Sequence, residues 1–360
     1  MEERNWLLRT FPDARLFLDM SQKPATANRL KSWGGGLVIL GLLLLMFFCW
    51  QRPQPSTSSP PLRVRIGYQP LAINLPFFVA MERGFFRTHG LDVEAVRFET
   101  ADAAADAMLR GDIASDFCLP MLTFLAREEK LPGSFLVYGF QIDTPEHSHE
   151  AILVLADSEI QQVSQLRNKR IGTFPGLAAK SYLTEALVKA GFSRADIVVE
   201  PLQVQLHLQA LRGKQVDALL AYEPTISIAT AAGFGRVVER AIFPRYLQNP
   251  FPVTVFAMPR AYALAHPKEA EAIVAAVADA IEVISRSPGE ANQTVIKYTS
   301  LQDTNVASTL NQPLNVLAHD VDTKVLQEFV DWHKKVGLLE SSIKIEGVLY
   351  RSGQKRSPAK

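Results

Sequence analysis

The chain has 360 residues, of which 48% are apolar and 21% are charged, and its formal net charge is +1. This length supports two lobes of ordinary size, and the balanced charge, which forms no basic stripe, excludes a nucleic-acid-binding surface. The two cysteines, Cys49 and Cys118, are too few for a disulfide framework or for a cysteine-based zinc site.

The first feature along the chain is an uncharged run, GGGLVILGLLLLMFFCW, at residues 34–50. Its length is at the short end for a helix that spans a bilayer, and Trp33 and Trp50 bracket it as interfacial aromatic residues do. Basic residues lie mostly before the run: Lys23, Arg29 and Lys31, against Arg52 alone close after it. We therefore predict a single-pass inner-membrane helix, with residues 1–33 in the cytoplasm and the large domain on the periplasmic side.

Other interpretations of residues 34–50 stay open at this point. A buried core helix is disfavoured because the run is apolar on every side. A cleaved signal peptide would need an unusually long n-region, and no Ala-x-Ala site follows Trp50. A lipoprotein signal would use Cys49 as the lipidated residue, but the bulky Phe48 stands where a small residue is needed.

A tether and a first α/β unit follow the apolar run. Residues 51–61, QRPQPSTSSPP, are dominated by Pro and Ser and predict a semi-extended tether. Strand and helix patterns then alternate, with Thr100 as an N-cap and Gly111 as a C-terminal stop for one helix. The predicted strands are 64–68, 91–98 and 113–119, and the predicted helices are 76–86 and 101–110.

A second, similar unit begins near residue 170. Its predicted strands are 170–173, 197–201 and 216–221, and its predicted helices are 178–190 and 204–212. Later elements are a strand at 253–258 and helices at 267–285 and 325–336, before a basic tail at 351–360. Strands that alternate with helices predict an α/β fold with mostly parallel sheets.

Three segments resemble the substrate-binding proteins of ABC importers for nitrate, sulfonates, taurine and thiamine precursors. They are RIGYQP at 65–70, VAMERGFFRTHGLDVE at 79–94 and ALRGKQVDALLAYEP at 210–224. The resemblance implies a type II periplasmic-binding-protein fold, with two lobes and a ligand cleft, preceded here by the transmembrane helix. The implied boundaries are 62–145 for the first part of lobe 1, 146–249 for lobe 2, 250–345 for the return to lobe 1, and 346–360 for the tail.

The resemblance also implies a function. Such a protein captures a small sulfonate-, taurine- or nitrate-like molecule and delivers it to ABC permease and ATPase subunits, without catalysis, cofactor or metal. One alternative is an enzyme of the thiamine-pyrimidine type on the same fold, but the cysteine-rich motif of that branch is missing, since Cys118 is the domain's one cysteine. Another alternative is a ligand sensor that acts on a membrane partner.

Four loops at predicted strand ends are the candidate ligand contacts, because open α/β sheets bind ligands beyond the carboxyl ends of their strands. Helix N-termini at these ends suit small anions. The candidate residues are Gln69, Asn74 and Phe77 in the first loop, Cys118 in the second, Thr173, Phe174 and Gly176 in the third, and Tyr222 and Glu223 in the fourth. We expect the third loop, through its amides and the Thr173 hydroxyl, to contact an anion.

Each loop also has a purely structural interpretation. Pro70 alone explains a turn with a solvated Asn74, and a buried cysteine such as Cys118 more often serves packing. The third loop is equally consistent with a plain Pro-Gly turn. In the fourth loop, Glu223 is equally consistent with a carboxylate that pairs with a nearby basic residue.

A local cluster, His147-Ser148-His149-Glu150, stands apart from these loops. Imidazole suits transition metals, so a metal site is one interpretation. We favour a solvated crossover loop between the lobes, in keeping with the nearby Asp143 and Glu146.

Overall fold

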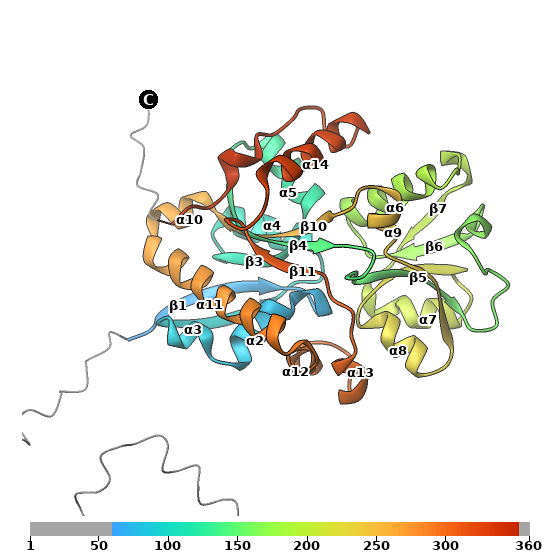
Figure 1. Cartoon of the computed structure of the whole chain (residues 1–360), viewed down its shortest axis with the longest axis horizontal. Coiled ribbons are helices and arrows are strands. Elements are labelled where there is room, and N and C mark those ends of the chain that lie inside the picture. Colours follow the sequence, from blue (N-terminus) through green and yellow to red (C-terminus); the bar gives the residue numbers. More distant parts are fainter. Residues whose placement is uncertain (1–59, 353–360) are drawn as a thin grey trace, which may run out of the picture. The chain divides into compact units, whose positions relative to one another are not determined.

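The computed structural model describes residues 60–352 of the chain (Figure 1). The predicted membrane helix at 34–50, the segment 1–33, the tether up to Ser59 and the end of the basic tail lie outside the described residues. Within 60–352, no helix combines the length and the apolar composition needed to cross a bilayer.

The first lobe is built on a six-stranded sheet with the order β11-β4-β10-β3-β1-β2. β1 pairs in parallel with β2 and β3, whereas β10 is antiparallel to β3 and β4, and β11 is antiparallel to β4. The strands are β1 (Leu62–Tyr68), β2 (Leu91–Arg97), β3 (Ser115–Pro120), β4 (Phe135–Asp143), β10 (Phe251–Pro259) and β11 (Leu314–Leu317).

Local chemistry sets the ends of helices in this lobe. The Thr100 hydroxyl accepts a hydrogen bond from the Ala103 amide at 3.2 Å, and Gly111 closes the helix with a φ of 78°. Both predicted helix ends are therefore confirmed. The helices are α2 (Leu75–Glu82), α3 (Phe85–Thr88), α4 (Ala101–Arg110), α5 (Met121–Lys130), α10 (Arg260–Ala265), α11 (Pro267–Arg286), α12 (Pro288–Asn292), α13 (Thr304–Ser308) and α14 (Thr323–Lys335).

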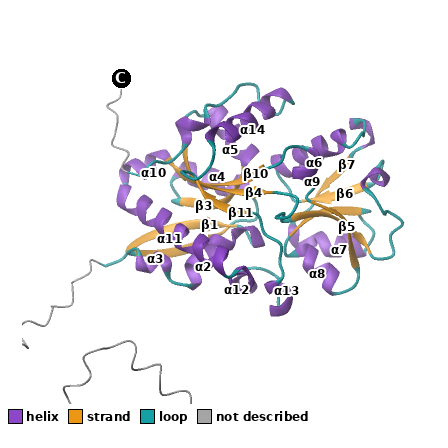
Figure 2. Cartoon of the chain, in the orientation of Figure 1, coloured by secondary structure: helices purple, strands orange, loops and turns teal. Residues whose placement is uncertain are grey.

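The second lobe is built on a five-stranded sheet with the order β7-β6-β8-β5-β9. β6 is parallel to β7 and β8, whereas β5 is antiparallel to β8 and β9. Helices cover both faces of each sheet (Figure 2). The elements are β5 (Glu150–Leu155), β6 (Arg170–Thr173), α6 (Leu177–Lys189), β7 (Val198–Pro201), α7 (His207–Arg212), β8 (Ala218–Tyr222), α8 (Thr225–Ala231), β9 (Gly235–Arg240) and α9 (Ile242–Tyr246).

Two segments carry the chain between the lobes. The first joins Asp143 at the end of β4 to Glu150 at the start of β5, and the second joins Tyr246 at the end of α9 to Phe251 at the start of β10. β10 returns from the second lobe and enters the first sheet from the opposite end, so it runs against its neighbours. The sheets are therefore mixed, and the prediction of mostly parallel sheets is wrong. The sequence pattern also misses β4, β5, β9 and β11, which take part in the antiparallel pairs.

Candidate functional site

A cavity of about 70 Å³ lies where the two lobes meet. Most of its wall is apolar, and no lysine or arginine among residues 60–352 lines it. From the first lobe come Gln69, Leu71, Ile73, Ala101, Asp102, Cys118, Pro120, Thr123, Val253 and Thr254, and from the crossover and the second lobe come His149, Phe174, Pro175, Gly176, Ala178, Ala179, Tyr182, Tyr222 and Phe243. Because both lobes supply the wall, a molecule in the cavity touches both.

A buried carboxylate organises the wall of the first lobe. Asp116, near the start of β3, accepts hydrogen bonds from the Gln69 side chain at 3.2 Å and from the Cys118 amide at 2.9 Å. Burial raises the pKa of Asp116 to about 7, although both hydrogen bonds oppose the shift. Asn74 supports the same loop, since its amide donates to the Gln69 carbonyl at 2.9 Å. Gln69 and Cys118 are thereby fixed at the edge of the cavity.

The start of α6 supplies part of the opposite wall. Gly176 precedes the helix with a φ of 129°, and a Cβ at this position would lie 3.2 Å from the Asp102 carboxylate of the first lobe. A larger residue would be strained by this positive φ, and the Asp102 side chain would have to shift by a few tenths of an ångström. Ala178 and Ala179 line the cavity in the first turn of α6, where free amide groups give the helix end a partial positive charge.

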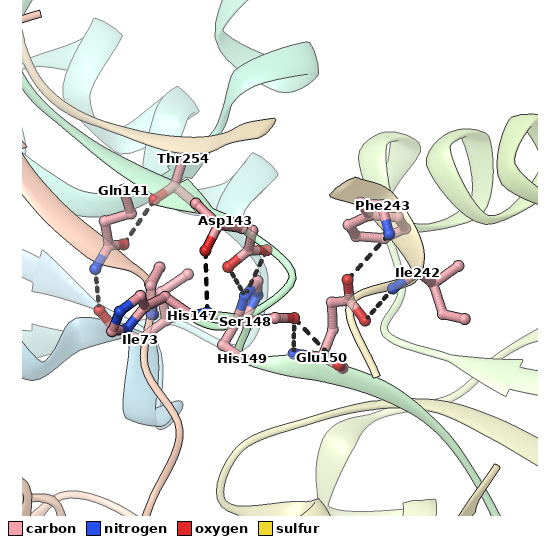
Figure 3. A network of polar contacts seen from close by, with 12 residues as sticks. Ile73, Gln141, Asp143, His147, Ser148, His149, Glu150, Ile242, Phe243 and Thr254 are labelled. Carbon is pink, nitrogen blue, oxygen red and sulfur yellow. Dashed lines mark hydrogen bonds and ion pairs between the residues drawn. The ribbon is translucent and has the colours of Figure 1, made fainter. Parts of the chain in front are cut away.

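The crossover after β4 supplies a buried ion pair (Figure 3). His149 Nδ1 lies 3.0 Å from the Asp143 carboxylate, and the two side chains are 5% and 0% exposed. The imidazole stacks on Tyr222 with ring centroids 5.1 Å apart. Burial lowers the pKa of His149, but the carboxylates of Asp143, Glu150 and Glu223 outweigh burial and hold this pKa above its ordinary value.

The prediction of a solvated crossover loop is therefore wrong for most of the cluster. His147 is exposed, but Ser148, His149 and Glu150 are buried, and so is Asp143. The reason is the pairing of β5 with β8, which places Glu150 opposite Tyr222 and draws the preceding residues inward. No cluster of three or more His, Cys, Asp or Glu side chains within 60–352 is arranged to hold a metal ion.

Two further buried carboxylates lie behind the cavity. Glu150 accepts hydrogen bonds from the Ile242 and Phe243 amides, each at 3.1 Å, and burial with the nearby Asp143 raises its pKa to about 7. Glu223 lies 3.1 Å from Arg240 and accepts a hydrogen bond from the Ser227 amide at 3.1 Å. Glu223 is thus engaged by a basic residue of the protein, as the structural interpretation of this loop expected.

The structure gathers five of the nine candidate residues around the cavity and places the others behind it. Gln69, Cys118, Phe174, Gly176 and Tyr222 line the wall. Asn74, Thr173 and Glu223 are buried and support lining residues, whereas Phe77 packs in the core against Tyr68 and Phe117. Lining residues that sequence analysis did not propose include Asp102, His149, Tyr182 and Phe243. A signal for Tyr182 exists in its spacing, one helical turn after Ala178.

Two mixed sheets, two crossovers and an interlobe cavity define the type II periplasmic-binding fold. The alkanesulfonate-binding protein SsuA from Xanthomonas axonopodis pv. citri, bound to MOPS, is similar with a TM-score of 0.67 and 21% identity, over 81% of this chain and 99% of SsuA. The nitrate-binding protein NrtA from Synechocystis PCC 6803 is similar with a TM-score of 0.61 and 14% identity, over 80% of this chain and 85% of NrtA. These similarities establish the fold.

The chain belongs to the NMT1-like family, because residues 57–299, more than half of its length, match that family. A Brucella abortus (strain 2308) protein described as a binding protein is 22% identical over 228 residues, which is 63% of this chain and 68% of that relative.

The same fold also occurs in an enzyme, the desulfurization enzyme DSZB, which is similar with a TM-score of 0.59 and 15% identity, over 80% of this chain and 96% of DSZB. The fold therefore does not separate binding from catalysis, and the site must. Cys118 is the free thiol at the cavity, and burial, together with the charge of Asp116, raises its pKa well above the ordinary value. The thiol is thus held protonated, unlike the thiolate that a cysteine nucleophile needs.

Proposed function

We propose that this chain is the solute-binding protein of an ABC import system, and that it captures a small solute between its lobes and delivers it to a permease. The observation that carries this proposal is the cavity between the lobes, to which both lobes contribute wall residues. A solute that touches both lobes stabilises the closed state by the difference between its affinities for the closed and open states. The closed form is then the one that a permease recognises. Binding without catalysis fits the protonated thiol of Cys118.

The solute class that we propose is a sulfonate-, taurine- or nitrate-like molecule. The cavity of about 70 Å³ compares with the roughly 10–15 Å³ of such volume that is enough for one water, so it has room for a small molecule. The amides at the start of α6 favour an anionic group there. Thr173, Phe174 and Gly176 precede these amides, and Tyr222 offers a flat aromatic wall.

We also propose that residues 34–50 anchor the protein in the inner membrane, with the binding domain in the periplasm. An anchor raises the effective concentration of the domain at a membrane-bound permease. Extraction of membranes with alkaline carbonate tests the anchor: the full-length chain stays in the pellet if the segment spans the bilayer. Release into the supernatant would contradict the anchor without touching the binding function.

The test of binding is calorimetry and thermal denaturation of the full-length chain with nitrate, methanesulfonate and taurine. A solute at 100 times its Kd should stabilise the fold by about 2.7 kcal/mol, and hence raise the Tm by about 5 °C or more. Ala178→Leu fills the cavity and should abolish this shift, because Ala178 is buried in its wall. Lys180→Leu, on the exposed side of the same helix, is the matched control and should bind as the wild type does. A shift that survives Ala178→Leu would place the solute elsewhere.

A further inference from the structure

The cavity has one ring nitrogen that no protein group satisfies. His149 lines the cavity, and its Nδ1 is held by Asp143 at 3.0 Å. No hydrogen-bond partner of His149 Nε2 lies among residues 60–352, and this atom is not among the fully enclosed unpaired atoms there. Nε2 is thus the ring nitrogen that remains available to a molecule in the cavity.

The carboxylates around the cavity, in contrast, already have protein partners. They come from every element that faces His149: Asp143 from β4 pairs with His149 itself, Glu150 from β5 with the Ile242 and Phe243 amides, Glu223 after β8 with Arg240, Asp116 from β3 with Gln69 and the Cys118 amide, and Asp102 from α4 with Arg127 at 3.7 Å. The remaining titratable groups of the described wall are Tyr182 from α6, Tyr222 and Cys118, and burial raises the pKa of each above its ordinary value. Each negative charge is engaged, whereas the imidazole has a free N–H when it is protonated.

We propose that His149 is the residue that selects for charge, donating from Nε2 to one oxygen of a small monoanionic solute while Asp143 holds Nδ1. This inference deepens the proposed function and rests on it. Asp143 and the imidazolium form a pair whose charges cancel, so an anion in the cavity meets a charge-assisted donor with no lysine or arginine needed in the wall. Tyr222, stacked on the ring, fixes its plane.

Binding is then linked to protonation of His149. The neighbouring carboxylates favour the charged ring, and a bound anion favours it further. Affinity for the anion therefore falls as the pH rises through the pKa of His149 in the free protein. Asp116 and Glu150, whose pKa values are about 7, gain negative charge over the same range and add to this fall, so the share of His149 is the part that a variant without the imidazole loses. A neutral molecule of the same shape gains nothing from the charged ring, so its affinity shows no such fall.

The experiment is calorimetry of the full-length chain with methanesulfonate and nitrate between pH 5.5 and 8.5, with dimethyl sulfone as the neutral counterpart of methanesulfonate. The wild type should bind the anions more tightly at low pH and bind dimethyl sulfone at least tenfold more weakly at pH 6. His149→Gln should weaken anion binding by about tenfold at pH 6 and flatten the pH profile. His147→Gln is the matched control, because His147 is exposed two residues away, and should follow the wild type.

A measurement on the wild type alone guards against a variant that does not fold. Titrations at pH 7.5 in imidazole and in Tris, two buffers without an oxyanion that differ in ionisation enthalpy, count the protons bound with the anion, and we expect a measurable uptake. Anion binding with no uptake and no pH dependence would overturn the role of His149 and leave the solute-binding function standing. Dimethyl sulfone bound as tightly as methanesulfonate would do the same. No binding of any anion or of the sulfone at any pH would overturn both proposals.

Discussion

Two buried histidines, His149 at the crossover between the lobes and His333 on helix α14, have pKa values shifted in opposite directions. His149 lies against the carboxylate of Asp143, and its pKa is raised. Within the described part of the chain, no carboxylate pairs with His333: its Nδ1 donates to the Phe329 carbonyl at 2.8 Å and its Nε2 accepts from the Tyr182 hydroxyl at 2.9 Å. Burial therefore dominates and lowers the pKa of His333 to about 4.

The difference shows that a buried histidine's role follows from its partners. His333 is neutral with both ring nitrogens satisfied, and it joins α14 to the Tyr182 side chain on α6. Such a ring is structural. His149 has a pKa that neighbouring carboxylates raise, and its Nε2 has no partner among residues 60–352 at the cavity wall, which is the arrangement of a binding group. The following predictions test this contrast, beginning with the largest expected effect.

Removing the carboxylate of Asp143 beside His149 should lower the free energy of unfolding the most. Asp143→Asn leaves a buried imidazolium without its counter-ion, and the free energy of unfolding should fall by about 3 kcal/mol at pH 6. His149 contributes stability that is present below its ordinary pKa and lost as the pH rises through the raised value, so the loss should shrink in alkaline solution. Urea denaturation at pH 6 and pH 9 measures both values.

The control for this variant is an exposed pair of the same chemistry. His319 lies 3.5 Å from Asp320, with side chains 71% and 61% exposed, so Asp320→Asn should change stability by less than about 0.5 kcal/mol. Equal losses from Asp143→Asn and Asp320→Asn would mean that the pair at the crossover is not ionised.

For His333 the pH dependence of stability should be opposite to that for His149, with stability lost as the pH falls. Its pKa is about 4 in the folded chain against about 6.5 in the unfolded chain, so the unfolded state binds the proton first and stability falls as the pH drops between these values. The loss amounts to about 3 kcal/mol. His333→Gln lacks this loss, and its difference in unfolding free energy from the wild type should narrow from pH 6.5 to pH 4. A constant difference across this range would refute the neutral state of His333.

The hydrogen bond that satisfies His333 should have a smaller effect. Tyr182→Phe keeps the ring but leaves Nε2 of His333 buried without a donor, at a cost of about 2 kcal/mol. Tyr246→Phe removes a hydroxyl that donates to Glu239 at 3.1 Å in a part-buried position, and should cost less than about 1 kcal/mol. Chemical denaturation at pH 7 measures the free energy of unfolding of both variants. A smaller loss in Tyr182→Phe than in Tyr246→Phe would mean that Nε2 of His333 finds another donor.

Much of the fold is predictable from local chemistry alone. Three features depend only on neighbours within a few residues: the N-cap at Thr100, the helix end at Gly111 and the strand at 170–173. The structure shows each of them at the predicted residues. The antiparallel strands β4 and β11 are different, because β11 pairs with β4 across more than 150 residues of chain. No local pattern encodes such a partner, so the mixed character of the sheets is visible only in three dimensions.

The candidate site divides in the same way. Loops that follow predicted strands do bring Gln69, Cys118 and Tyr222 to one cavity, because strand ends meet at one edge of a sheet. The same reasoning does not identify His149, because a stretch rich in histidine, serine and glutamate predicts a solvated loop. Its burial is decided by Asp143 and by the register that sets Glu150 opposite Tyr222, both of which need the assembled lobes.

The smallest predicted effect asks whether the carboxylate or the aromatic neighbour sets the charge of His149. Tyr222→Phe keeps the ring that stacks on the imidazole at 5.1 Å with a 15° angle between planes, and it removes no charge. We expect stability to change by less than about 1 kcal/mol. The His149 pKa, followed by the imidazole resonances in nuclear magnetic resonance spectra, should stay raised in Tyr222→Phe and fall in Asp143→Asn, because only the second variant removes a negative charge at 3.0 Å. If Tyr222→Phe lowered the pKa as far as Asp143→Asn does, the stacked phenol would have to hold the proton on the ring, and the contrast between His149 and His333 would rest on aromatic contact instead of charge.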